Sequence, residues 1–314
     1  MTASRETKTP LTDLLPTELW QQVIGPYLRP QEVGHLSRTC REAVGLFQPQ
    51  IDIIHAHVQK LLTLVTTGQQ DQAETLLLEL QKEDPYLLQQ VLSYKGKVTD
   101  CSGRAFHGIT ALQYALWAYD RHMWEMLLKY IPSTEAHRQL QELETTGTEH
   151  GKHYDFQPLL DAYQAHITHI KNVFKRTGDL RAAKKSWAAV GKQQGQVPAC
   201  VANQYCRRDK AFIVNGQVCA FNDTELPRTL LVYDIIKGQA IPWFPLPDAN
   251  ATDGLGISFA ICKRAESRAR IASNVMDPVA QDDLAAMTAL RDARQLDLEQ
   301  LCIKLEYTRP LSKP

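Results

Sequence analysis

Apolar residues recur at intervals of three and four through most of the chain, which is the spacing of an amphipathic helix. This pattern predicts helices at 14–24, 33–47, 58–65, 72–80, 86–94, 111–118, 121–131, 156–174, 180–190 and 277–305, with a short helix or turn at 197–205. Shorter runs rich in β-branched and aromatic residues predict strands at 211–214, 217–221, 229–236, 243–246 and 257–262. The sequence therefore predicts an α+β fold that is mostly α, with a small antiparallel sheet.

Turn residues separate these segments. Gly68 closes the helix that precedes it, and Asn215-Gly216 between two strand runs predicts a β-hairpin. We interpret residues 100–108 as a turn-rich loop. Residues 263–270 are predicted to be exposed. They contain a small basic patch that suits either an acidic partner or plain solvation and consists of Lys263, Arg264, Arg268 and Arg270.

The pattern divides the chain into three parts, at residues 10–50, 51–147 and 148–314. In the first, Pro16 suits the first turn of a helix, and Gly25-Pro26 should end that helix after about two turns. A second helix follows Pro30, and Gly45 and Pro49 are expected to end it. This part is a compact run of short helices whose apolar residues can face a partner.

The first part resembles the F-box, a three-helix module that binds the Skp adaptor of SCF-type cullin ubiquitin ligases. The resemblance implies that the adaptor contacts nine residues, namely Leu15, Pro16, Glu18, Leu19, Ile24, Leu28, Val33, Leu36 and Cys40. Ser37 and Arg41 also match in order and spacing. Ala43 departs from the family, many of whose members have tryptophan there. The alternative is a helical cap that packs on the rest of the chain.

The second part resembles an ankyrin-like segment of helical hairpins. Thr110, Leu112, Tyr114 and Ala115 match the first helix of a repeat, residues 123–128 match the second, and residues 61–80 resemble a degenerate copy. Glutamine stands at 113 in place of the usual histidine. At most two repeats are present, so we expect them to lean on flanking helices.

Aromatic side chains in this segment suggest a surface for a target protein, because such residues are enriched at binding hot spots. The candidates are Trp117, Tyr119 and His122, of which the first two lie near the turn between helices and are predicted to be exposed. Trp124, at helical spacing, is predicted to be core.

Composition narrows the functional classes. The chain has equal numbers of basic and acidic residues and a formal net charge of zero, so no global positive field favours nucleic acid or an anionic membrane. No apolar run is long enough for a membrane span, and no apolar stretch of the secretory type follows residues 1–8. Seven scattered cysteines favour reduced thiols in a cytosol.

Residues with catalytic or metal-binding chemistry show no strong pattern. Cys200 and Cys206 have no second pair at zinc-finger spacing, and no local feature marks either thiol as an activated nucleophile. His166 and His169 share a helix face without a metalloprotease motif, which favours a solvated face or a satisfied pair. His150 and His153 flank Gly151 in a polar loop and have no carboxylate ligand nearby in the sequence. We therefore predict no catalytic residues, no metal site and no cofactor.

Two functions of different classes remain. In the first, the chain is a non-catalytic substrate receptor of an SCF-type ligase that binds the Skp adaptor and an unidentified target. The whole arrangement resembles F-box effectors that intracellular bacteria inject into host cells by type IV secretion, which implies a cytoplasmic location, in the host cytosol. In the second, the chain is an effector enzyme, a transferase or cysteine hydrolase, with its active site in residues 148–314.

Overall fold

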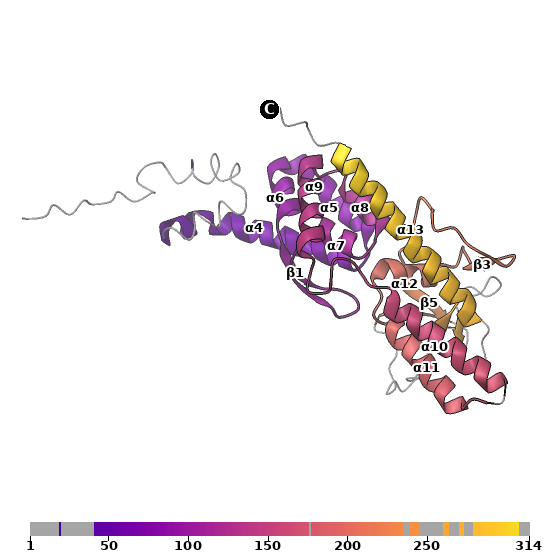
Figure 1. Ribbon diagram of the computed structural model, residues 1–314. Helices are drawn as coiled ribbons and strands as arrows, with labels where there is room; N and C mark the ends of the chain where they lie inside the picture. The colour runs from indigo at the N-terminus through magenta and orange to yellow at the C-terminus, as the bar shows by residue number, and fades with distance from the viewer. Residues whose placement is uncertain are drawn as a thin grey trace, which may run out of the picture.

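The computed structural model describes Leu19 and residues 41–175, 177–234, 239–244, 260–263, 270–272 and 279–307 (Figure 1). Helices dominate these residues, and the strands pair as separate two-stranded antiparallel ribbons instead of one small sheet. The chain is α+β and mostly α, as predicted. Within the described ranges, no helix combines the length and apolarity that a membrane crossing requires.

The first half of the described chain combines helices with one β-ribbon. Its elements are α4 (Arg41–Thr66), α5 (Gln70–Glu83), α6 (Pro85–Ser93), β1 (Gly96–Thr99), β2 (Ala105–Ile109), α7 (Ala111–Trp117), α8 (Arg121–Leu127) and α9 (Ser133–Thr146). α4 packs against α5, α6 and α7, while α5 packs against α8, so the pair α4–α5 stacks on the pair α7–α8. These contacts bury the predicted apolar faces.

Local chemistry sets the ends of these helices. After α4, Gly68 has a left-handed backbone with φ of 73°, and the N–H groups of Gly68 and Gln69 donate to the carbonyls of Val65 and Leu64 at 3.1 and 2.8 Å. This confirms the predicted stop. The start of α6 is set by Asp84, whose carboxylate accepts the N–H groups of the two residues after Pro85.

The helix α4 corrects one prediction. Gly45 and Pro49 were expected to end a helix, but α4 continues through Pro49 to Thr66. A proline inside a helix removes one backbone hydrogen bond and crowds the carbonyl four residues earlier, which here belongs to a glycine. The continuous apolar face from Ile54 to Val65 packs into the core and outweighs that local cost.

The segment predicted as a loop at 100–108 is the turn and second strand of a hairpin. Val98 pairs with Phe106 and Thr99 with Ala105. The Asp100 carboxylate closes the turn, because it accepts the N–H groups of Ser102 and Arg104 at 2.9 and 3.0 Å. The loop prediction is therefore wrong for residues 105–108, which lie in β2.

Gln113 has a structural role that the sequence comparison with ankyrin repeats did not suggest. Thr110 and Gln113 form a reciprocal capping box at the start of α7. The Gln113 amide also donates to the Gln139 carbonyl at 3.2 Å and to the Glu142 carboxylate at 3.1 Å. One side chain thus fixes both the helix start and the position of α9.

The second half combines helices with short ribbons. Its elements are α10 (Gln157–Phe174), α11 (Leu180–Gln194), α12 (Ala199–Cys206), β3 (Ile213–Val214), β4 (Gln217–Val218), β5 (Leu231–Asp234), β6 (Gln239–Pro242), β7 (Ala260–Cys262), β8 (Arg270–Ala272) and α13 (Val279–Tyr307). The ribbons pair β3 with β4, β5 with β6 and β7 with β8. The predicted hairpin at Asn215-Gly216 is confirmed. The strand predicted at 243–246 is wrong for its first two residues, because β6 ends at Pro242.

The long helix α13 joins the two halves. Figure 1 shows it running from the side of α10 and α12 back along the first half of the molecule, and it packs against α8, α9 and α10. Buried residues from Ile54 to Leu305 form one connected apolar cluster. The described helices therefore share a common core.

A buried polar network ties β7 to the helices of the second half. The Gln194 amide donates to the Ile261 carbonyl at 2.7 Å and to the Tyr163 hydroxyl at 2.8 Å, while its oxygen accepts the Ile261 N–H at 2.9 Å. Asp283 accepts the Lys263 N–H at 3.1 Å and the Tyr163 hydroxyl at 3.3 Å. Burial raises the pKa of Asp283 well above its ordinary value.

Lys263 contradicts the prediction of an exposed basic stretch. Only 1% of its surface is exposed, its ammonium donates to the Gln204 carbonyl, and it lies 4.6 Å from the centre of the Phe212 ring. Burial, helped by the nearby Arg207 charge, lowers the pKa of Lys263 to about 8. Of the other residues of the predicted patch, Arg270 begins a strand, β8, and Arg264 and Arg268 lie outside the described residues.

A buried ion pair fixes the loop before β5 to the first half. The two terminal nitrogens of the Arg228 guanidinium, Nη1 and Nη2, each donate to the Asp120 carboxylate at 2.7 Å. Arg228 Nε donates to the Gln70 side chain at 3.0 Å. Burial alone would raise the pKa of Asp120, but the Arg228 charge and hydrogen bonds hold it below its ordinary value. Asp120 also caps α8 by accepting the Met123 N–H.

We predict that Arg228→Met lowers the free energy of unfolding by about 3–5 kcal/mol, because it leaves the buried Asp120 carboxylate without a partner. Urea denaturation of the purified protein measures this change. Arg138→Met, which breaks a half-exposed pair with Glu135, is the matched control and should cost about 1 kcal/mol or less. Equal effects of the two substitutions would contradict the structural role of Arg228.

We also predict a specific pH dependence for Lys263→Met. A lysine whose pKa falls on folding destabilises the native state below its folded pKa, and this cost disappears as the pH rises to the unfolded value of about 10.4. The stability of the wild type should therefore rise relative to that of the variant between pH 8 and about 10.4. Thermal unfolding across this range tests the prediction, with Lys192→Met on the exposed face of α11 as control. Parallel pH profiles for Lys263→Met and wild type would contradict it.

Candidate functional site

Of the residues predicted to bind an adaptor, the structure describes Leu19. Leu19 is helical and keeps 41% of its surface exposed. The other predicted contacts lie outside the described residues: Leu15, Pro16, Glu18, Ile24, Leu28, Val33, Leu36 and Cys40. An apolar residue left uncovered suits a docking surface better than a buried cap.

The helix α4 links this segment to the core. It begins at Arg41, immediately after the predicted adaptor contacts, and its first part projects from the packed body of the molecule (Figure 1). Residues 48–53 are exposed or half-buried, whereas Ile54 and Val58 are buried. From Arg41 to Ile54 the helix rises about 20 Å. The structure therefore connects the N-terminal segment to the core by continuous helix.

The prediction that Trp117 and Tyr119 are exposed is wrong. Trp117 keeps 1% of its surface exposed and packs against Phe106 and Tyr154. Tyr119 has a left-handed backbone with φ of 56° that turns its ring toward His153, with the ring centres 5.1 Å apart. These large rings fill space between α7 and the segment after α9. Trp124 is buried, as predicted.

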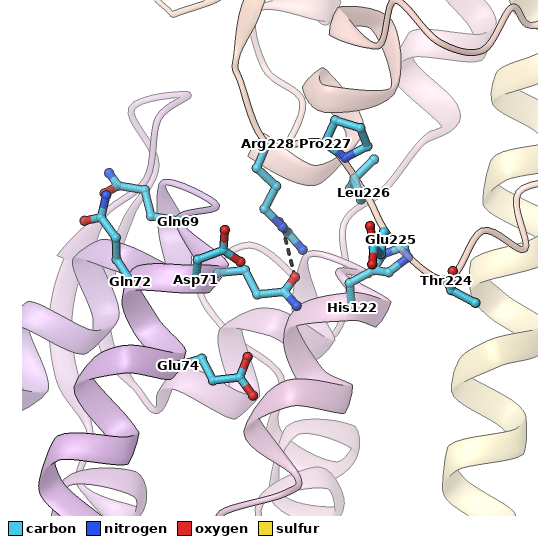
Figure 2. A pocket seen from close by; sticks show the side chains of 11 residues that line it. Gln69, Asp71, Gln72, Glu74, His122, Thr224, Glu225, Leu226, Pro227 and Arg228 are labelled. Carbon is cyan, nitrogen blue, oxygen red and sulfur yellow. Dashed lines mark hydrogen bonds between the residues drawn. The ribbon is translucent and has the colours of Figure 1, made fainter.

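His122 is also buried, but it lines a cavity of about 530 Å³. The cavity opens between the start of α5, the start of α8 and the loop before β5 (Figure 2). Its walls are mainly polar and consist of Gln69, Gln70, Asp71, Gln72, Glu74, His122, Thr224, Glu225, Leu226, Pro227 and Arg228. The pair of Arg228 and Gln70, drawn as a dashed line in Figure 2, lies between its two sides.

Some of the charged side chains that line the cavity are neutralised by an ion-pair partner, and others have no such partner in the part of the chain that the structure describes. Arg228 is neutralised by Asp120 beneath it, and Glu74 forms an ion pair with Lys129 at 2.8 Å. Asp71 and Glu225 are exposed and have no ion-pair partner among the described residues. Asp71 also lies in the first turn of α5, where a carboxylate stabilises the helix. The cavity thus offers carboxylate and amide oxygens to a ligand that donates hydrogen bonds or carries positive charge.

His122 is held as a neutral donor. Its Nε2 lies 2.9 Å from the Asp223 carbonyl, which can only accept a hydrogen bond. Burial lowers the pKa of His122. A neutral ring with Nε2–H facing that carbonyl leaves Nδ1 as acceptor, so His122 contributes another acceptor near the cavity wall.

The two cysteines considered as nucleophiles are unreactive by their surroundings. Cys200 is buried and donates to the Ala118 carbonyl at 3.2 Å, and burial raises the pKa of its thiol strongly. Burial raises the pKa of Cys206 to about 12. Neither side chain lines the cavity, and Thr224 is the one hydroxyl among the described residues that do.

Of the four histidines considered as metal ligands, three form hydrogen bonds within the fold. His166 is buried rather than solvated and bonds the Ser186 hydroxyl at 3.1 Å. His153 bonds the Glu144 carboxylate at 2.6 Å, and His150 bonds the Ala105 carbonyl at 2.9 Å. His169 is half-buried on α10. Over the described ranges, no three His, Cys, Asp or Glu side chains gather as metal ligands would.

Sequence reasoning missed the residues of the cavity other than His122. Residues 69–74 follow a helix-ending glycine and residues 224–228 precede a strand, so each segment by itself has the composition of a connector. The segments lie about 150 positions apart along the chain. Only the packing of α5 and α8 against the loop before β5 brings them together.

Comparison with known proteins places the chain among bacterial relatives. The family model of the CBUA0006 C-terminal domain matches residues 158–305. The uncharacterized protein CBUA0006 of Coxiella burnetii (strain RSA 493 / Nine Mile phase I) is 37% identical over 285 residues, which cover 82% of this chain and 77% of that protein. This alignment extends well beyond the family domain into the preceding helices. No solved structure matches the chain. The chain belongs to the CBUA0006 family.

Proposed function

We propose that the chain is a substrate-receptor subunit of an SCF-type cullin ubiquitin ligase. The observation that carries the proposal is the run beginning Leu15-Pro16, whose apolar residues match the F-box in order and spacing. The exposure of Leu19 supports it, since an apolar helix face that contacts an adaptor must be uncovered in the free chain. Such a receptor needs no chemistry of its own.

The form of α4 supports this role. A receptor works by holding its target beside the conjugating enzyme, and it raises the effective concentration of the target most when the connection is stiff. A continuous helix from Arg41 into the core provides a stiffer connection than a flexible linker of the same length. The adaptor-binding segment and the target-binding surface would then keep a fixed separation.

We assign target recognition to the cavity beneath the loop before β5. It replaces the surface proposed from the sequence, because Trp117 and Tyr119 are buried, and it retains His122 in its wall. Asp71 and Glu225 at its rim suit a basic segment of the target. The proposed partners are thus a Skp-family adaptor and a target protein with exposed lysine or arginine.

We propose the cytosol of a host cell as the place of action. The relative in Coxiella burnetii supports a bacterial origin, and a bacterial chain that uses a cullin ligase must reach a cell that has one. This agrees with the resemblance to F-box effectors delivered by type IV secretion.

The second candidate is an effector enzyme with its active site in residues 148–314. The polar cavity is only partly in its favour, because a concave polar site is the usual setting for chemistry but only residues 224–228 of the lining belong to that region. Against a cysteine hydrolase, the pKa values of the Cys200 and Cys206 thiols are raised by burial. The receptor function is therefore preferred.

We predict that Leu15→Ala with Pro16→Ala weakens binding to the purified Skp adaptor at least about 30-fold, which is the loss expected if only one of the two is an anchor that contributes about 2 kcal/mol. Calorimetric titration measures the affinity, and co-purification from host lysate gives a second test. The matched control is Leu78→Ala with Pro158→Ala, an exposed leucine and an exposed proline in the first turn of a helix. Unchanged affinity in the Leu15/Pro16 variant, with normal unfolding, would overturn the F-box assignment.

For the cavity, we predict that Asp71→Lys with Glu225→Lys abolishes the ubiquitination of those host proteins that the wild-type chain targets, while adaptor binding stays normal. The reversed charges repel a basic target segment and involve no residue of the predicted adaptor-binding run. Quantitative mass spectrometry of ubiquitinated peptides from expressing cells provides the measurement. Glu79→Lys with Glu299→Lys, two exposed acids elsewhere, is the control. An unchanged set of ubiquitinated proteins in the cavity variant would exclude this site.

A further inference from the structure

The hairpin of α10 and α11 ends in a projecting tip, which we define as the described residues of the range 171–185. Figure 1 shows the joined ends of these helices at the edge of the molecule, far from α4. The N–H groups of Thr177 and Gly178 both donate to the Asn172 carbonyl at 3.0 Å. A Cβ atom at Gly178 would lie 2.8 Å from the backbone of Asn172 and Val173, so this close turn requires glycine. Glycine at 178 is therefore required where the chain turns into α11.

Two large apolar side chains at the tip face solvent. Phe174, the last residue of α10, is 59% exposed, and Leu180, the first residue of α11, is 47% exposed. Beneath them, Ile170 and Ala183 form a small apolar cluster with Val173 that is separate from the main core. The tip has its own packing, which leaves Phe174 and Leu180 free for an external contact.

Positive charge surrounds these two residues. The exposed cations of the tip are Lys171, Lys175, Arg181, Lys184 and Lys185. Residues 171–185 contain six basic residues and one acid, whereas the rest of the chain contains 29 basic and 34 acidic residues. The single acid, Asp179, accepts the Arg181 N–H as the cap of α11. Within the described structure, no ion pair involves any of the five cations.

We propose that this tip docks on the surface of a membrane that contains anionic lipids. Phe174 and Leu180 would enter the boundary between headgroups and acyl chains, where partly exposed apolar side chains gain burial. The surrounding lysines would contact the lipid phosphates, and their long stems allow the ammonium groups to reach the headgroups. The contact is peripheral, which agrees with helices too short or too polar to cross the bilayer among the described residues.

The residue types favour lipid over nucleic acid. Four of the five exposed cations are lysines, which act as mobile point charges, whereas nucleic-acid sites favour the planar fork of arginine. Leu180 beside Phe174 provides aliphatic surface that inserts into a bilayer but does not stack on bases as an aromatic ring does. A folded acidic protein would need a shaped complement to a narrow convex tip, whereas a fluid bilayer adapts to it.

Docking of the tip on a membrane is independent of adaptor binding, and it would determine where in the cell the chain acts. The tip and α4 lie at opposite ends of the molecule (Figure 1), so the same chain could contact a membrane and a protein partner at once. The cavity lies between these ends, formed by α5, α8 and the loop before β5. A receptor held in this way would act on targets near an anionic membrane surface.

Flotation of the full chain with vesicles tests the proposal. We expect binding to vesicles of phosphatidylcholine with 30% phosphatidylserine, little binding to pure phosphatidylcholine, and loss of binding at high salt. Lys184→Gln with Lys185→Gln should weaken binding roughly 25-fold, since each basic residue near the surface contributes a factor of about five. Phe174→Ser with Leu180→Ser should also weaken it, which a purely electrostatic contact would not require.

Matched variants separate the tip from general surface effects. Lys82→Gln with Lys152→Gln, and Leu78→Ser with Leu296→Ser, remove exposed lysines and leucines elsewhere and should bind like wild type. Unchanged thermal unfolding excludes misfolding as the cause of a loss. The proposal is overturned if the chain ignores anionic vesicles, if the control pairs lower binding equally, or if a short RNA or DNA binds the tip while vesicles do not.

Discussion

The arrangement of the two halves depends on the buried pair of Asp120 and Arg228, together with the packing of α13 against α8, α9 and α10. Asp120 caps α8 in the first half, and Arg228 belongs to the loop that leads into β5 in the second. The bidentate pairing satisfies both desolvated charges, and Arg228 Nε also donates to the Gln70 side chain; without these partners the burial would be costly. Arg228 also lines the cavity. One side chain of the pair therefore serves both the connection of the two halves and the wall of the candidate recognition site.

A second polar network performs a similar task in the C-terminal half. The ribbons there have strands of two to four residues, and a two-stranded ribbon of that length is not stable alone. Gln194 compensates by bonding both the N–H and the carbonyl of Ile261, as a neighbouring strand would. Asp283 and Lys263 continue the network toward α13 and α12. Side chains of helices thus provide the hydrogen bonds that a larger sheet would otherwise supply.

The proposed functions occupy different places on this framework. The F-box-like run precedes α4, the cavity lies at the junction of the two halves, and the basic tip ends the hairpin of α10 and α11. Each uses a distinct chemistry: apolar anchors for the adaptor, acidic and amide oxygens for a target, and lysines with exposed apolar residues for lipid. A chain with zero net charge can serve all three because its charges are segregated in space.

The sequence by itself determined the helices, the main turns and the fold class. Periodic apolar positions placed α5, α6, α10, α11 and α13 correctly, because one-sided apolarity follows directly from the geometry of a helix against a core. The turns at Gly68 and Asn215-Gly216 could be predicted because their backbone requirements are local. Tertiary structure decided which side chains are covered. Three residues that were predicted to be exposed are buried, namely Trp117, Tyr119 and Lys263. The predictions failed because periodicity indicates an apolar face but not what packs over a turn. The cavity joins segments about 150 residues apart, and no local pattern records which distant loop will close over a helix start.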